Sequence, residues 1–266
     1  MGIIQSHSLS TERQRAKKPL PEEKKFFKKV LTLKPKSGTI RESKRDRKET
    51  KIMNYIVIDT ETANTMDDPM VYDCGWSVVN EMGEALVERS FVNADIFLEE
   101  RELMESAYFA EKIPQYIEGI NEGTRKLAHF ETIRKILASD CRKFGVVGIV
   151  AHNMAFDYRA CNKTLRWLSK SEKRFFFPYG IEILDSLKMA RTVFAKDEDY
   201  LNFCRENDYI CKNKQPRLTA EILYRYLSGD NDFIESHTGL EDTQIEKLIF
   251  AECVKRNREV LRPMWS

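Results

Sequence analysis

Two continuous apolar runs set the strongest limit on how this chain can fold. Tyr55–Ile58 reads Tyr-Ile-Val-Ile, and Val146–Ala151 reads Val-Val-Gly-Ile-Val-Ala. Runs of this kind are typical of strands that are buried on both faces, as in sheets that helices cover from both sides. We therefore expect both runs to lie inside a sheet that is flanked by helices.

The segments around these runs predict a mixed sheet. Val71–Asn80 and Ala85–Asn93 are apolar and β-branched, and the four residues between them, Glu-Met-Gly-Glu, predict a hairpin. A further strand is expected at residues 181–184. Helical patterns follow at residues 98–110, 124–139, 153–168, 186–194, 199–207, 217–228 and 241–257. Because a hairpin comes first and strands alternate with helices afterwards, the predicted fold class is α/β.

Charge divides the chain into two parts. Residues 1–52 contain 16 Lys and Arg against 6 Asp and Glu, which leaves 28 and 36 for the remainder. The first part alternates cations with Ser, Thr and Pro and has few aliphatic residues, so we expect a basic, flexible extension that precedes a domain at residues 53–266. Two interpretations of the extension stay open, an arm that attracts nucleic acid and a solvated tail.

Composition excludes several classes of protein. The chain has 266 residues, of which 42% are hydrophobic, so it can bury a sizeable core. No apolar run approaches the ~18 residues that cross a bilayer, and the first residues lack the pattern of a secretory signal. Its six cysteines form no Cys-x-x-Cys pair, which favours reduced thiols. We expect a cytoplasmic protein that binds no membrane.

Acidic residues follow two of the expected strands. Asp59 and Glu61 come at the end of the first run, and residues two apart on an extended chain point to the same side. Two close carboxylates need a cation, or one of them must stay protonated, and a hard divalent ion is the natural partner. The alternative for this motif is a solvated loop after the strand. Asp157 lies about one turn into the helix after the second run, where Asn153 is suited to cap the helix. Ligands in open α/β sheets gather beyond such strand ends.

A third group of polar residues opens the last expected helix. Asp242 lies three and seven residues before Ile245 and Ile249, so it shares their inward face. A buried carboxylate without a partner is expensive, and metal coordination offsets that expense. His237 lies just upstream across a Gly-containing turn and is within reach of the same pocket as a general base. Glu241 points elsewhere and is expected to be solvated.

In this order, the three groups resemble the DEDDh, or DnaQ-like, family of 3′→5′ exonucleases. That family includes the proofreading epsilon subunit of bacterial DNA polymerase III, RNase T and oligoribonuclease. The resemblance covers about residues 53–258. Its supporting features are His-Asn-x-x-Phe-Asp at residues 152–157, Leu-Asp-Ser-Leu at 184–187 and Pro-Arg-Leu at 216–218. What distinguishes the family is the ordered set of four acids and a histidine.

The resemblance implies a ribonuclease H-like fold with a mixed five-stranded sheet, and hydrolysis of nucleotides from a 3′ end. By their match to the family motifs, Asp59, Glu61, Asp157 and Asp242 would hold two Mg²⁺ or Mn²⁺ ions, with Glu61 also in a catalytic role. Two such ions suit in-line phosphodiester hydrolysis. His237 would take the proton of the attacking water.

The resemblance also assigns positions that contact the terminal nucleotide, namely Thr60, Thr62, Asn153 and Phe156. Phe156 is equally well explained as a core residue of its helix. Many family members continue the first motif to a glycine, whereas this chain has Ala63-Asn64. Loss of the glycine removes backbone freedom, so the binding of the strand end is expected to differ. Asp185 follows a strand and is interpreted as a helix cap.

The expected substrates are 3′ ends of single-stranded DNA or RNA, and the sequence does not choose between them. Grip on a single strand needs cations and stacking aromatics. Residues 163–177 supply both kinds of side chain. The candidates are Lys163, Arg166, Trp167, Lys170, Lys173, Arg174, Phe175, Phe176 and Phe177. The alternative is that these aromatic residues belong to the core and that the charged residues form a solvated face. A DNA polymerase or other replication protein is a further expected partner. The competing hypothesis is a catalytically idle scaffold that recruits a polymerase or nucleic acid.

Overall fold

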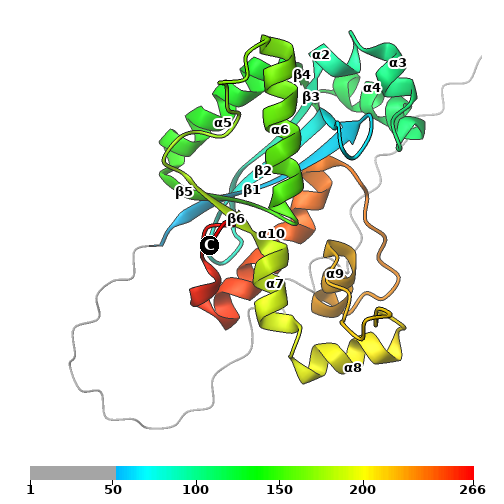
Figure 1. Ribbon diagram of the computed structural model, residues 1–266, viewed down its shortest axis with the longest axis vertical. Coiled ribbons are helices and arrows are strands. Elements are labelled where there is room, and N and C mark those ends of the chain that lie inside the picture. The colour runs from blue at the N-terminus through cyan, green and yellow to red at the C-terminus, as the bar shows by residue number, and fades with distance from the viewer. Residues whose placement is uncertain (1–51) are drawn as a thin grey trace, which may run out of the picture. The chain divides into compact units, whose positions relative to one another are not determined.

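The computed structural model describes residues 52–266 (Figure 1). The predicted basic extension lies outside these residues except for its last position, and the domain division at residues 52 and 53 stays a prediction. The described part of the chain forms a six-stranded sheet with the order β4-β3-β2-β1-β5-β6. Its strands are β1 (Asn54–Ala63), β2 (Met70–Asn80), β3 (Ala85–Asn93), β4 (Lys126–Ala128), β5 (Val146–Ala151) and β6 (Glu182–Asp185).

The pairing of the strands has the topology of a ribonuclease H-like fold. β1, β2 and β3 form an antiparallel meander, while β5 pairs in parallel with β1 and β6 with β5. This confirms the predicted mixed α/β sheet and adds a sixth strand. β4 pairs with the open edge of β3 over three residues, where a helix was expected.

Helices cover the sheet from both sides, as the two buried runs require. Those on the first face are α5 (Phe130–Phe144) and α6 (Met154–Ser169), and those on the second are α7 (Ser186–Phe194), α9 (Ala220–Ser228) and α10 (Gly239–Arg256). α8 (Glu198–Glu206) connects α7 to the segment before α9. α6, α7, α8 and α10 agree with the predicted ranges to within two residues. α5 was predicted at residues 124–139 and instead begins at Phe130, because residues 126–128 pair with β3. α9 begins at Ala220 because Thr219 caps it.

The alternation of side chains along β1 divides the core into two layers. Ile56 and Ile58 face α5 and α6, whereas Tyr55 and Val57 face α7, α9 and α10. β1 continues through Ala63, well beyond the predicted end at Ile58, because β2 pairs with it along its whole length. The Asp-x-Glu motif therefore lies within a strand rather than after one.

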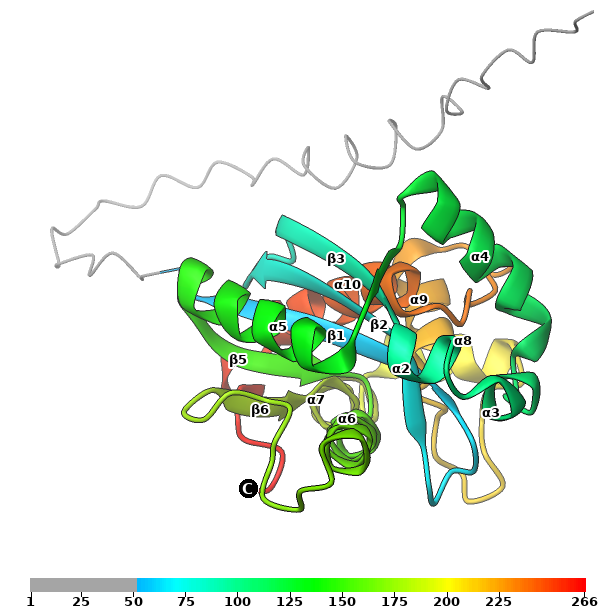
Figure 2. The same cartoon turned by 90° about the horizontal axis from the view of Figure 1, so that it is seen from above.

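A third apolar cluster lies at the far ends of β1 and β2. It packs Tyr72 and Tyr116 with the short helices that follow β3, which replace the single helix expected at residues 98–110. They are α2 (Ala94–Phe97), α3 (Arg101–Glu105), the 3-10 turn Ala110–Lys112 and α4 (Ile113–Glu122). Figure 2 shows these helices together at one end of the sheet. A second 3-10 turn, Arg258–Val260, follows α10.

Membrane-spanning helices and cysteines are the two features on which the sequence made further predictions. Over residues 52–266, no helix is both long and apolar enough to cross a membrane. All six cysteines lie in this described part and are free thiols, as the sequence predicts.

Candidate active site

The end of β1 brings polar residues of both sheet faces together. Asp59 and Glu61 point to the side of α10, and Thr60 between them points to the side of α6. The Thr60 hydroxyl is buried and donates a 2.8 Å hydrogen bond to Oδ1 of Asp157 on α6. The hydroxyl therefore orients the Asp157 carboxylate at the edge where Asp59 lies.

Two glycines allow α10 to begin directly on the sheet. A Cβ at Gly75 of β2 would lie 2.1 Å from the backbone nitrogen of Leu240, and a Cβ at Gly239 would lie 2.7 Å from the nitrogen of Gly75. Only glycine fits such a close approach of two backbones. The N–H of Gly239 also donates a 2.8 Å hydrogen bond to Oδ2 of Asp73 on β2. The start of α10 is thereby held against the neighbour of β1.

This packing carries Asp242 and His237 to Glu61. One ligand atom of each of these three residues lies within 4.8 Å of the others. Asp242 is buried and accepts hydrogen bonds from the Ser236 hydroxyl, at 2.7 Å, and from the Thr238 N–H, at 3.1 Å. The arrangement joins a carboxylate from β1, a carboxylate from α10 and an imidazole from the segment before α10.

His237 is held from outside the cluster. Its backbone is left-handed, with φ of 49°. Its ring stacks on Phe109, with ring centres 4.7 Å apart and an interplanar angle of 17°. The Lys112 ammonium lies over the same Phe109 ring and donates a hydrogen bond to the His237 carbonyl, at 3.2 Å. The segment between β3 and α4, which the sequence motifs did not include, therefore positions this histidine.

The carboxyl groups raise one another's pKa values. Burial, followed by Glu246 and Asp157, raises the pKa of Asp59 well above its ordinary value. Burial, followed by Asp73 and Asp242, raises the pKa of Glu61 to about 8. Burial raises the pKa of Asp157 to about 7 although the Thr60 hydroxyl opposes the change, and burial also raises that of Asp242. The cluster is electrostatically unfavourable without a cation.

The donor set fits a hard divalent cation. Within residues 52–266, no Lys or Arg forms an ion pair with Asp59, Glu61, Asp157 or Asp242. The Oδ2 atom of Asp59 is buried without a hydrogen-bond partner. Carboxylate oxygens are the ligands that Mg²⁺ and Mn²⁺ prefer, and a cation would supply the missing partner.

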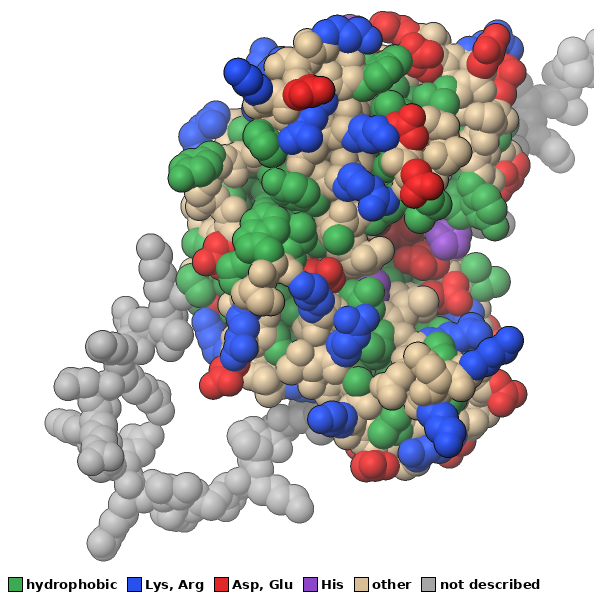
Figure 3. Space-filling view, in the orientation of Figure 1, with side chains coloured by type: hydrophobic (Ala, Val, Ile, Leu, Met, Phe, Trp, Pro, Cys, Tyr) green, Lys and Arg blue, Asp and Glu red, His purple; other side chains and the backbone are tan. Residues whose placement is uncertain are grey.

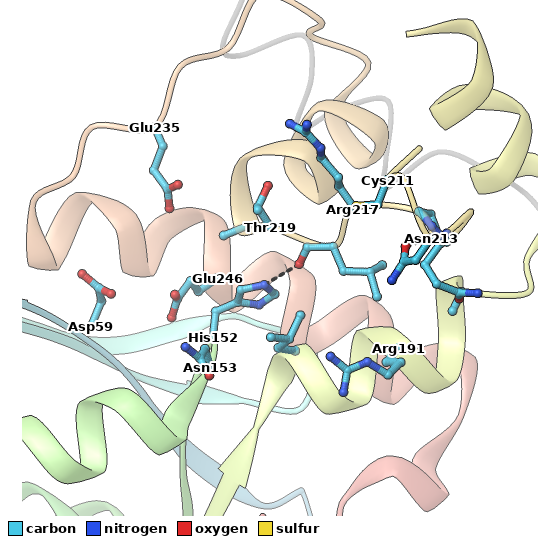
Figure 4. A pocket seen from close by; sticks show the side chains of 16 residues that line it. Asp59, His152, Asn153, Arg191, Cys211, Asn213, Arg217, Thr219, Glu235 and Glu246 are labelled. Atoms are coloured by element: carbon cyan, nitrogen blue, oxygen red, sulfur yellow. Dashed lines mark hydrogen bonds between the residues drawn. The ribbon is translucent and has the colours of Figure 1, made fainter. Parts of the chain in front are cut away.

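A cleft of about 640 Å³ opens beside these acids. Figure 4 shows Asp59, Glu235 and Glu246 toward one side of it and Arg191 toward the other, with His152 between them. In Figure 3 acidic side chains and a histidine gather at a hollow in the visible face. Of the four site carboxylates, Asp59 lines this cleft, which gives a ligand access to it from the side of α7 and α9.

The positions assigned to the terminal nucleotide differ in exposure. Asn153 is exposed and left-handed, with φ of 74°, and its side chain makes no capping hydrogen bond, contrary to the expected cap. Phe156 packs partly against the core, and Thr62 is partly exposed. Asn64, at the position of the missing glycine, has φ of 71°. Asparagine tolerates this conformation, so the left-handed backbone is kept without the glycine. The expected difference in binding of the strand end stays a prediction.

The sequence analysis missed several charged residues at this edge. Asp73 is buried and bonded to Tyr116 and Arg125. Glu241 is exposed, as expected, and also accepts a 2.7 Å hydrogen bond from Arg125. Glu246 lines the cleft. Its position four residues after Asp242 places both acids on one face of the helix, and this spacing could have indicated it from the sequence.

Asp185 follows the prediction. Its carboxylate accepts from the N–H groups of Leu187 and Lys188 and caps α7, so its role there is structural.

This chain is similar to known proteins in its structure and not detectably in its sequence. No family model matches the sequence, and no curated protein matches it. Exonuclease X in complex with 5′ overhanging duplex DNA is similar over 77% of this chain and 93% of its own, at 14% identity and a TM-score of 0.42. The Mg²⁺- and Mn²⁺-bound form of S. pombe Pop2p is similar over 77% and 84%, at 12% identity and a TM-score of 0.42. Similarity at this level does not establish an activity.

Proposed function

We propose that this chain is a metal-dependent 3′→5′ exonuclease that hydrolyses single-stranded DNA or RNA. The observation that carries the proposal is the meeting of Asp59, Glu61, Asp157, Asp242 and His237 at one end of β1, beside an open cleft. These residues come from three separate segments of the chain. Four carboxylates without a cationic partner are unfavourable for folding, so their convergence favours a function that uses the charge.

The four carboxylates would hold two Mg²⁺ or Mn²⁺ ions. When bound, such a pair activates the attacking water and stabilises the leaving 3′ oxygen. Thr60 fixes Asp157 through its hydroxyl, and the Ser236 hydroxyl and Thr238 N–H fix Asp242. The chain thereby holds two of the ligands in place before any metal binds, which reduces the reorganisation needed on binding.

His237 would act as the general base. Its ring atoms lie close to Glu61 and Asp242, and stacking on Phe109 restricts the plane of the imidazole. A base must lie within hydrogen-bond reach of the proton that it removes, and a histidine near neutral pH can both accept and release it. Lys112 holds the backbone of the same residue through its carbonyl.

The last turn of α6 and the loop that follows it offer a surface for the single strand. Trp167 is 38% exposed and Phe175 is 52% exposed. The Lys170 ammonium lies 4.6 Å from the Trp167 ring centre, and the Arg166 guanidinium lies 4.7 Å from that of Phe175. Exposed rings beside cations are suited to stacking bases and phosphates. Phe176–Phe177, which the sequence grouped with them, are buried in the core.

A nuclease assay tests the proposal. The substrates are 5′-labelled single-stranded DNA and RNA of one sequence, with Mg²⁺, Mn²⁺ or EDTA. We expect a ladder that shortens from the 3′ end, is abolished by EDTA and by Asp157→Asn, and is strongly reduced by His237→Ala. Asp199→Asn, on the exposed face of α8, is the matched control. The polymer that shortens faster identifies the substrate.

Two outcomes would contradict the proposal. If neither polymer is cleaved while the strands still bind, the chain is an idle binding module of the kind that the sequence left open. If cleavage persists in EDTA or in Asp157→Asn, the metal site has been assigned incorrectly. Association with a DNA polymerase stays a prediction that this assay does not address.

A further inference from the structure

We propose that Glu246 is a fifth carboxylate of the metal site and binds a divalent cation together with Asp59. The inference rests on the proposed metal-dependent function and adds a ligand that the four-acid motif does not contain. It follows from the position of Glu246, from its unpaired oxygen and from the charges around it.

Glu246 lies on the face of α10 that is turned toward the site. It follows Asp242 by four residues, about one helical turn, so the two side chains project in the same direction. Its residue exposure is 3%, and it lines the cleft together with Asp59. In Figure 4, Glu246 and Asp59 lie next to each other on one side of the cleft, one from α10 and one from β1.

Both carboxylates have an unpaired oxygen. Oε2 of Glu246 and Oδ2 of Asp59 are buried and have no hydrogen-bond partner. Buried polar atoms are paired in most proteins, so each of these unpaired oxygens calls for a partner. A cation between them would satisfy both atoms at once.

The surroundings of Glu246 contain further negative groups. The carboxylates of Asp157, Glu235 and Asp242 lie close enough to Glu246 for their charges to act on it. Within the described part of the chain, no Lys or Arg forms an ion pair with Glu246. A cation is therefore the partner that matches this environment, because it neutralises several of these groups together.

The test compares Mn²⁺ binding by the whole chain and by Glu246→Gln, which keeps the shape and removes the charge. Isothermal titration calorimetry at pH 7.5 gives affinity and stoichiometry, and a melting curve in EDTA reports on folding. We expect Glu246→Gln to bind Mn²⁺ about tenfold or more weakly. Its metal-free melting temperature is expected to equal or exceed that of the unchanged chain. Glu252→Gln, on α10 but outside the cleft, should bind Mn²⁺ normally.

Each other result overturns the inference. If Glu246→Gln folds and binds Mn²⁺ with unchanged affinity, Glu246 is not a metal ligand, while the proposed nuclease can still stand on its own assay. If Glu246→Gln is destabilised in EDTA and Glu246→Asp does not recover Mn²⁺ affinity, the side chain acts in packing. If the unchanged chain binds no Mn²⁺, this inference and the proposed metal-dependent function fail together.

Discussion

Replacing Glu61 by glutamine should stabilise the metal-free protein while weakening its response to metal. Burial and the neighbouring carboxylates raise the pKa of Glu61 from 4.5 to about 8. At pH 7 the unfolded chain therefore holds a charged Glu61 and the native chain a largely neutral one. Since pH 7 is about 2.5 units above the ordinary pKa of Glu61, binding this proton on folding lowers the free energy of unfolding by about 3 kcal/mol. Glutamine removes that cost, since it is neutral in both states.

In a protein of this size, about 3 kcal/mol corresponds to a rise in melting temperature of about 6–12 °C. The assay is a thermal melt at pH 7 in EDTA and again with Mn²⁺. Glu61→Gln should melt higher than the unchanged chain in EDTA and gain less from Mn²⁺, because it has lost a ligand. Glu118→Gln, on the exposed face of α4, is the control and should change neither value. The reasoning is refuted if Glu61→Gln lowers the metal-free melting temperature or keeps the full Mn²⁺ response.

Three further perturbations test the same structure. Because the site carboxyls have raised pKa values, the native metal-free protein binds more protons than the unfolded chain between about pH 4 and pH 8. Thermal melts in EDTA should therefore show a melting temperature that falls as the pH rises through this window, and a rise would contradict the reasoning. Gly75→Ala would place a Cβ 2.1 Å from the α10 backbone, so urea unfolding should show a loss of about 3 kcal/mol or more and Mn²⁺ binding should weaken. Gly148→Ala meets only side chains and should lose less, and equal losses would argue against a special role for the α10 contact. Arg125→Met leaves the buried Asp73 without its cation and should cost about 3–5 kcal/mol in the same unfolding assay; a loss under about 1 kcal/mol would mean that Tyr116 and the backbone suffice.

Local patterns in the sequence determined the elements of the fold. The runs at Tyr55–Ile58 and Val146–Ala151 form the adjacent parallel strands β1 and β5, because a continuous apolar run can be buried on both faces. The hairpin of β2 and β3 agrees with its predicted bounds to within one residue. The short strand β4 has no such pattern over its three residues and exists because the edge of β3 is available to pair with it.

In the candidate site, too, some features follow from local sequence and others from tertiary contacts. Residue spacing pointed to Asp59, Glu61 and Asp157 as candidates, since alternation along a strand and the start of a helix are local features. The order in which the groups occur along the chain then selected them together. The closeness of β2 and α10, which brings Asp242 to Glu61, depends on the contact of Gly75 with the α10 backbone, between segments far apart in sequence.

The sequence by itself therefore selected the candidate residues of the site. Only the tertiary structure decided that Glu246 lines the same cleft as Asp59 and that Asp73 is bonded to Arg125. The physical reason is that burial and charge pairing depend on all neighbours in space. The local sequence around an acidic residue on a helix is the same whether its side chain faces water or a cluster of other carboxylates.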